Sequence, residues 1–136
     1  MKIVAISDAV TLGLHTMELL ARQPEQRWST RIIAEKLNAS AHHLSKIHSR
    51  LVKAGLVRST RGPRGGLILA RDPSTISLMD VFTSIDGEFR PDHCLFGYPV
   101  CSRRTCVFGS LIRDVTRQVT EYFRNTTVAD LVENTG

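Results

Sequence analysis

The chain carries all three of its cysteines in one short segment, where Cys94, Cys101 and Cys106 follow the spacing C-x6-C-x4-C. Thiolates are soft ligands that suit zinc, copper(I) and iron–sulfur clusters. Structural zinc sites usually contain closely spaced cysteine pairs, which this segment lacks. Three thiolates on a loop rich in glycine and proline can instead hold three corners of a cluster. The spacing therefore indicates a metal centre, with a disulfide plus one free thiol, or three reduced cysteines without a role, as the alternatives.

The composition is that of a soluble globular protein of one domain, or of a small domain with an appendage. The chain has 136 residues and a mean hydropathy of −0.07. No apolar run approaches the roughly 18 residues that span a bilayer, and polar residues interrupt the first 21, so they do not form a signal peptide. We expect a cytoplasmic protein without a membrane partner, and in that compartment clustered cysteines favour metal binding or redox chemistry.

Charge is distributed unevenly along the chain. Residues 1–71 contain 12 Lys and Arg against 4 Asp and Glu, whereas residues 72–136 contain 6 against 9. A basic half beside a mildly acidic half suggests that only the first half meets a polyanion such as nucleic acid. A solvated basic face without a partner is the alternative.

The first half predicts three helices followed by a β-hairpin. Apolar spacing predicts a helix over residues 7–22, a second capped by Ser29 or Thr30, and a third that Ser40 caps and Gly55 ends. The runs "LVRST" and "LILAR" are joined by "RGPRGG", whose glycines and proline favour a turn. This order of elements is that of a winged helix-turn-helix.

The second half predicts a short helix in "SLMDVFTSIDG", the cysteine loop, a long helix, and a last helix that "TVAD" begins with a capping box. The long helix carries one apolar stripe over about four turns. A chain this short has little core left to cover such a stripe, so we interpret it as a homodimer contact rather than as packing within the domain. The stripe contains Phe108, Leu111, Ile112, Val115, Val119, Tyr122 and Phe123.

The amino-terminal part of the third helix carries the residues expected to read DNA in the major groove. Histidine can donate or accept hydrogen bonds there, and Lys46 can reach a guanine edge or a phosphate. Polar residues on an exposed helix are common, so no single one decides the matter. The candidate contacts are Ser40, His42, His43 and Lys46, with Arg50 one turn further.

The turn of the hairpin is the more specific signal. Arg58, Arg61 and Arg64 lie on or beside it, with glycine and proline between them. Arginine gains from the concentrated negative potential of a narrow minor groove. We therefore expect this wing to contact a double-stranded, pseudo-palindromic DNA operator, to which a two-fold symmetric dimer is suited.

With these residues in view, the chain resembles the Rrf-two family of bacterial regulators, which includes the iron–sulfur regulator IscR and the nitric-oxide-sensing repressor NsrR. The resemblance runs from Met1 to about Glu133 and is strongest in "SRLVKAGLVRSTRGPRGG", in the cysteine loop after "SIDGEF" and in "TVADLVE". It implies a dimeric winged-helix transcription factor whose cluster lies near the dimer helix and controls DNA binding. It also implies that the three cysteines are cluster ligands and that Ser40, His42, His43, Lys46 and Arg61 contact DNA.

The chain departs from the family pattern at two points. The usual loop is C-x5-C-x5-C, so the middle cysteine is displaced here by one residue. IscR-like members place a histidine ligand where this chain has Gly109, which cannot ligate. In NsrR-like members an acidic residue of the partner protomer completes a [4Fe–4S] cluster, and Asp8 falls at that position. We therefore favour [4Fe–4S] over [2Fe–2S] with Asp8 as the fourth ligand; Asp8 as part of the first helix's cap, and His93 or His15 as ligand, are the alternatives.

The sequence thus predicts a mainly α fold with a small β-hairpin: a winged helix-turn-helix domain over 1–72, and a cysteine loop with dimerisation helices over 73–136. The expected function is that of a repressor whose DNA affinity depends on a cluster that senses redox state, iron or nitric oxide. A thiol switch without a cluster, signalling by cysteine oxidation on the same scaffold, is the main alternative. A small iron–sulfur electron carrier would leave the basic half and the wing unexplained. An enzyme is not expected, because the sequence shows no phosphate-binding glycine loop and no paired carboxylates in a cleft-forming context.

Overall fold

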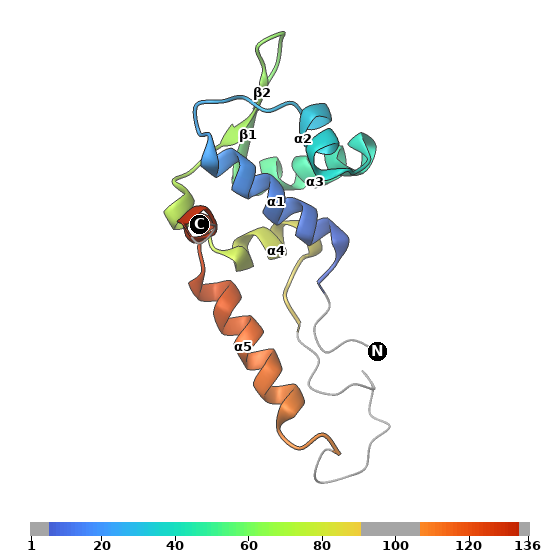
Figure 1. Cartoon of the computed structure of the whole chain (residues 1–136), viewed down its shortest axis with the longest axis vertical. Helices are drawn as coiled ribbons and strands as arrows, with labels where there is room; N and C mark the ends of the chain where they lie inside the picture. Colours follow the sequence, from blue (N-terminus) through green and yellow to red (C-terminus); the bar gives the residue numbers. More distant parts are fainter. Residues whose placement is uncertain (1–5, 91–106, 134–136) are drawn as a thin grey trace.

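The computed structural model describes residues 6–90 and 107–133 of the chain. A helical body carries the hairpin at one end, and a long helix extends from the other end (Figure 1). In chain order the elements are α1 (Asp8–Arg22), α2 (Thr30–Leu37), α3 (Ala41–Lys53), β1 (Val57–Thr60), β2 (Gly66–Leu69), the 3-10 turn η1 (Pro73–Thr75), α4 (Leu78–Asp86), α5 (Leu111–Asn125) and α6 (Val128–Glu133).

Serine side chains begin the two helices of the helix-turn-helix. Ser29 Oγ accepts a hydrogen bond from the backbone N–H of Ile32, and Ser40 Oγ accepts one from the N–H of His43. Between the helices, Asn38 takes a left-handed conformation with φ of 51°, which asparagine tolerates better than most residues. The predicted second and third helices are thus confirmed, and the left-handed Asn38 forms the tight turn between them.

The predicted hairpin is present, and its glycines are required by packing. Strands β1 and β2 are antiparallel, and β2 also exchanges backbone hydrogen bonds with Trp28 through Leu67. A Cβ at Gly65 would collide with the backbone carbonyl of Thr60, and one at Gly66 would come within 2.9 Å of backbone atoms of Trp28. The sequence predicted only that these glycines favour a turn; the structure adds that the chain itself leaves no room for a side chain at Gly65 and Gly66.

Helix α1 lies at the centre of the hydrophobic core. Its side chains Val10, Met17 and Leu20 are at most 1% exposed and pack in one cluster with residues of α2, α3, α4 and α6. Backbone hydrogen bonds from Leu78 N–H to Thr126 and from Val128 N–H to Ile76 join the start of α4 to the start of α6. The core therefore includes residues on both sides of position 72, and the predicted division into two domains there stays a prediction.

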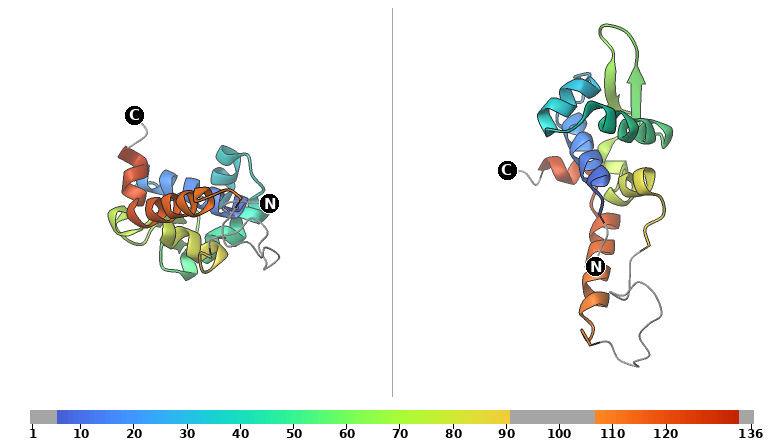
Figure 2. Two further views of the ribbon diagram at one scale, coloured as in Figure 1. Left: turned by 90° about the horizontal axis from the view of Figure 1, so that it is seen from below. Right: turned by 90° about the vertical axis from the view of Figure 1, so that its right-hand side faces the viewer.

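Helix α5 leads away from this core, as two further views show (Figure 2). At its carboxyl end Phe123 packs against Phe82 of α4 and Phe89, with ring centroids 6.2 and 6.4 Å apart. We call Phe82, Phe89 and Phe123 the aromatic cluster. Ile112 and Thr116 are also buried, whereas Leu111 and Tyr122 are 51% and 54% exposed. The stripe predicted from the sequence is thus divided between a buried face and an exposed apolar flank.

Candidate nucleic-acid interface

Helix α3 presents a polar face on the side opposite the core. His42, Lys46 and Lys53 are exposed and recur at steps of four and seven residues, which places them on one side of a helix. The opposite face of α3 is apolar and packs into the core. The buried apolar residues of α3 are Leu44, Ile47 and Leu51, each at most 2% exposed.

The amino-terminal end of α3 gathers four of the predicted DNA contacts. Ser40 caps the helix, and His42, His43 and Lys46 lie exposed in its first two turns. Ser40 uses its oxygen to accept from the His43 N–H at 3.3 Å, so its hydroxyl hydrogen can still be donated to an acceptor outside the chain. The arrangement offers hydrogen-bond donors and positive charge at the helix end that enters the major groove in helix-turn-helix proteins.

His48 is a buried polar residue of this region that the sequence analysis did not single out. It is 3% exposed and joins three helices, because its Nε2 lies 3.1 Å from Thr16 Oγ1 of α1 and its Nδ1 lies 3.0 Å from Thr30 Oγ1 of α2. Thr16 Oγ1 already donates its only hydrogen to the carbonyl of Leu12. It must therefore accept from His48, which places the ring proton on Nε2 and leaves Nδ1 to accept from Thr30.

Burial also keeps this imidazole neutral. Removal from solvent lowers the pKa of His48 to about 4, because the low-dielectric interior disfavours the charged ring. The burial of His48 could have been recognised in the sequence, because His48 lies one turn after Leu44 and next to Ile47 on the apolar side of α3. The periodicity thus marks it as an inward-facing residue.

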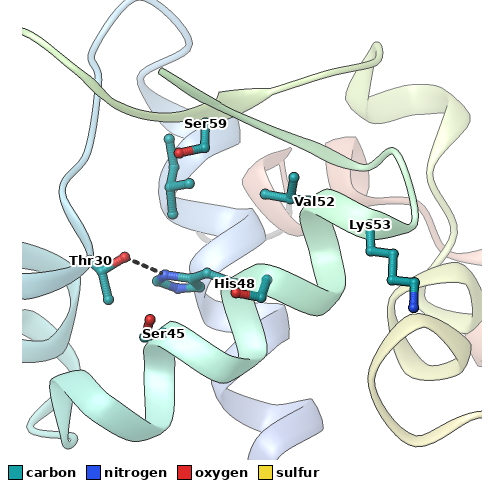
Figure 3. A pocket seen from close by; sticks show the side chains of 8 residues that line it. Thr30, Ser45, His48, Val52, Lys53 and Ser59 are labelled. Carbon is teal, nitrogen blue, oxygen red and sulfur yellow. Dashed lines mark hydrogen bonds between the residues drawn. The ribbon is translucent and has the colours of Figure 1, made fainter. Parts of the chain in front are cut away.

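A shallow groove separates α3 from the hairpin, and Figure 3 shows its lining. Ser45, Ser49 and Val52 line it from α3, and Ser59 and Leu67 from the hairpin. In the same view the ring of His48 faces Thr30 across the base of the groove. The groove is open to solvent, so it separates α3 from the hairpin without forming an enclosed ligand cavity.

The three arginines predicted for the wing occupy different places on it. Arg61 and Arg64 lie in the exposed turn at the tip, which projects beyond the helices in Figure 1. Arg58 lies within β1 and alternates with Ser59, so its side chain belongs to the face of the hairpin away from the groove. Within the described residues none of the three forms an ion pair, which leaves their charge available to a polyanion.

Arg50 is held apart from the other predicted contacts. Its Nη1 donates a 2.7 Å hydrogen bond to the backbone carbonyl of Ile85, near the carboxyl end of α4. The structure thus brings Ser40, His42, His43 and Lys46 together at one end of α3, and places Arg50 on the flank of the helix that faces α4.

The predicted cluster ligands are described only in part. Cys94, Cys101 and Cys106, and the rival ligand His93, lie outside the described residues. Asp8 is the first residue of α1, follows the cap Ser7, and is exposed. Within residues 6–90 and 107–133, no three His, Cys, Asp or Glu side chains are arranged to hold a metal ion.

The other rival ligand, His15, is partly engaged on its own helix. Its Nδ1 lies 3.8 Å from Glu18 Oε2, and its side chain is 55% exposed. By contrast, the Asp8 carboxylate makes no hydrogen bond or ion pair with any described residue. Of these two candidates on α1, Asp8 is the one whose side chain has no hydrogen-bond or ion-pair partner within residues 6–90 and 107–133.

The matching protein family decides what kind of protein carries this interface. The family model described as "Rrf2: Iron-dependent Transcriptional regulator" matches residues 6–134. The chain belongs to the Rrf2 family. Because this is a family of transcriptional regulators, the assignment agrees with the prediction that the chain is not an enzyme. It also confirms the resemblance to the Rrf-two family seen in the sequence.

Curated relatives of the chain include transcriptional regulators named IscR. The HTH-type transcriptional regulator IscR of Yersinia pseudotuberculosis is 34% identical over 102 residues, which are 75% of this chain and 62% of that protein. The chain therefore spans less than two thirds of the length of these curated relatives.

Solved structures confirm the predicted winged-helix fold. CymR, the global cysteine regulator of B. subtilis, is 32% identical, with a TM-score of 0.79 over 98% of this chain and 99% of that one. The oxidized form of Staphylococcus aureus CymR is 30% identical, with a TM-score of 0.75 over 100% and 99%. IscR of T. potens is 28% identical, with a TM-score of 0.73 over 98% and 89%. Among the described helices of this chain, none is long and apolar enough to cross a membrane.

Proposed function

We propose that this Rrf2-family chain is a homodimeric repressor that binds a pseudo-palindromic DNA operator in the cytoplasm. The observation that carries the proposal is the joint position of a polar face on α3 and an arginine-bearing wing at one end of the molecule. Within each protomer, α3 would enter the major groove while the wing follows the backbone into the adjacent minor groove.

The contacts divide into base readout and backbone positioning. Ser40, His42, His43 and Lys46 lie where base edges and the nearest phosphates would be reached from the start of α3. Arg61 and Arg64 lie at the wing tip, where their charge meets phosphates or a narrow minor groove. We propose that Arg58 acts from the side of the wing, on the phosphate backbone.

The exposed apolar flank of α5 supports the dimer. Leu111 and Tyr122 are about half exposed and lie three turns apart on one side of this helix, with the partly buried Val115 between them. An exposed apolar flank of this kind is suited to a second copy of the same helix. Because α5 extends from the end opposite the hairpin, a dimer built on it leaves both wings free for DNA (Figure 1).

The donor set fits an iron–sulfur cluster held by Cys94, Cys101, Cys106 and the Asp8 carboxylate of the partner protomer. Thiolates are the usual cluster ligands, and the Asp8 carboxylate is exposed and unengaged within the described part of the chain. The family's description as iron-dependent and the likeness to IscR proteins add support. When bound, a [4Fe–4S] group, which we favour over [2Fe–2S], supplies chemistry that responds to oxidants, iron supply or nitric oxide.

A thiol switch is the second candidate, and one comparison favours it. The chain is 30% identical to the oxidized form of S. aureus CymR over its full length. In this case oxidation of two of the three cysteines to a disulfide, with an external oxidant taking the two electrons, would itself alter DNA binding.

Iron and acid-labile sulfide per chain, measured on protein purified without oxygen, separate the two candidates. About four of each, with a broad band near 400 nm, are expected for the favoured cluster. About two of each would indicate [2Fe–2S] and return His93 and His15 as ligands. Protein without iron that reversibly loses two hydrogens on oxidation would support the thiol switch.

Substitutions then test the ligands. Alanine at Cys94, Cys101 or Cys106 should abolish the chromophore, and a full spectrum in any one of the three contradicts that ligand. Asp8→Ala should destabilise the cluster, so that it is lost faster to a chelator. The matched control is Glu25→Ala, which removes an exposed carboxylate beyond the other end of α1.

Salt dependence of DNA binding tests the interface. Arg61→Ala should weaken binding to every duplex and reduce the slope of log affinity against log salt by about 0.9, the value for one phosphate contact. Arg124→Ala removes the same charge from α5 and should leave the slope unchanged. An Arg61→Ala slope equal to that of the wild type would show that Arg61 contacts neither phosphate nor groove.

A further inference from the structure

The last turn of α4 is held by two other helices at neighbouring residues. Arg50 Nη1 of α3 donates to the carbonyl of Ile85 at 2.7 Å. Ser7 Oγ, at the cap of α1, donates to Asp86 Oδ2 at 2.7 Å and also accepts from the N–H of Val10. The recognition helix and the start of α1 therefore meet at the same turn, over sequence separations of 35 and 79 residues.

The hydrogen bond from Arg50 gives the Ile85 carbonyl a partner that α4 itself does not provide. The last four carbonyls of a helix have no partner within it and carry partial negative charge. Ile85 is one residue before the end of α4, and Gly87 caps the helix by donating its N–H to Thr83 instead. A guanidinium at this place makes a charge-assisted hydrogen bond, which holds the Arg50 side chain against the end of α4.

The side chain beneath this bond is tightly packed. Ile85 is 4% exposed and fits against Gly13 of α1, where an added Cβ would collide with its Cδ1 and lie 3.6 Å from Ile47 Cγ2 of α3. Close-packed interiors transmit displacement because they contain few voids to absorb it. A shift of the α4 end is therefore felt by both α1 and α3.

We propose that Arg50 is a positioning residue that docks the recognition helix α3 on the carboxyl end of α4, and that it does not contact DNA. This role differs from the one predicted from the sequence, and it rests on the proposed function, since it assumes that α3 reads DNA. This role has a regulatory consequence. A movement of Ser7, which precedes Asp8, would displace Ile85 and Asp86 at the end of α4, and this displacement would change the angle of α3.

Salt-dependent binding of the full chain distinguishes docking from direct contact. The probe is a duplex that the wild-type chain has selected from a random-sequence library. Arg50→Ala should bind it about tenfold more weakly with the wild-type salt slope, because no phosphate contact is lost. A slope reduced by about 0.9 would show that Arg50 neutralises a phosphate and would overturn the proposal.

Two further variants distinguish the loss of docking from a folding defect and from a general loss of charge. Arg50→Lys keeps a charged donor that can reach a carbonyl, so it should restore most of the lost affinity; no recovery in a folded Arg50→Lys chain would count against docking. Arg124→Ala, which removes an exposed cation from α5 without touching the bond, is the charge control. If Arg50→Ala lowers the slope while Arg124→Ala leaves it unchanged, Arg50 acts through its charge at the interface and the docking role is wrong.

The coupling to α1 is tested with Ser7→Ala. In the double variant Ser7→Ala with Arg50→Ala, the loss of affinity should be clearly smaller than the product of the two single losses, because both changes release the same turn. Independent, multiplying losses would overturn the coupling. A wild-type chain that selects no duplex at all would overturn the proposed function together with this inference, whereas an altered slope in Arg50→Ala alone overturns only the inference.

Discussion

Acidification should destabilise the folded chain through His48. This imidazole is 3% exposed, is bonded to Thr16 on α1 and Thr30 on α2, and has a pKa lowered by burial to about 4, against an ordinary value of 6.5. Because its folded-state pKa lies below its unfolded-state pKa, the unfolded chain takes up the proton first. The stabilisation that neutral His48 provides is therefore complete above about pH 6.5 and is lost as the pH falls toward about 4.

The size of the effect follows from the two pKa values. One unit of pKa difference corresponds to about 1.4 kcal/mol, so the full loss is about 3 kcal/mol. Between about pH 7.5 and about pH 5 the linkage relation gives a fall of about 2 kcal/mol in the free energy of unfolding. That range also keeps Asp72 ionised, since hydrogen bonds from the Ser74 side chain and backbone lower the pKa of its carboxyl.

Urea unfolding across this pH range, at fixed protomer concentration and in one cluster state, measures the effect. His48→Gln keeps an N–H toward Thr16 but cannot titrate, so it should lose the fall of about 2 kcal/mol while being about 1–3 kcal/mol less stable near neutral pH. His42→Gln, an exposed histidine on the same helix, should behave as the wild type. If His48→Gln shows the full pH dependence of the wild type, the reasoning from its burial is refuted.

Three further outcomes follow from packing and capping. Gly13→Ala should destabilise the chain by about 1 kcal/mol in urea unfolding, since its methyl group collides with Ile85 Cδ1; in an Ile85→Val background the same change should be neutral or stabilising, because alanine is the better helix former. Ser77→Ala removes the capping box that Ser77 forms with Asp80 and should cost about 1 kcal/mol in the same assay, an absence of any loss arguing against the cap. Phe123→Ala should cost about 3–5 kcal/mol, because it empties the aromatic cluster, and an unchanged thermal midpoint would contradict that packing.

Most of the local structure could be predicted because its causes lie within a few residues. Ser29 and Ser40 cap their helices through N–H groups three residues ahead, and Thr127 and Asp130 form the predicted capping box across the same separation. The hairpin followed from glycine and proline in its turn. These signals are short-range, so they can be recognised without knowledge of what the elements pack against.

The sequence by itself thus determined the order of elements, the basic half, and the polar face of α3 that identifies the interface. Only the tertiary structure decided the roles of side chains whose partners lie far away in the chain. Arg50 and Lys46 look alike as exposed cations on one helix, yet Arg50 meets the carbonyl of Ile85, 35 residues away. His48 is separated by 32 residues from Thr16. Periodicity shows which face of a helix turns inward, but the partner it meets there depends on how the helices pack, and that arrangement is a property of the whole fold.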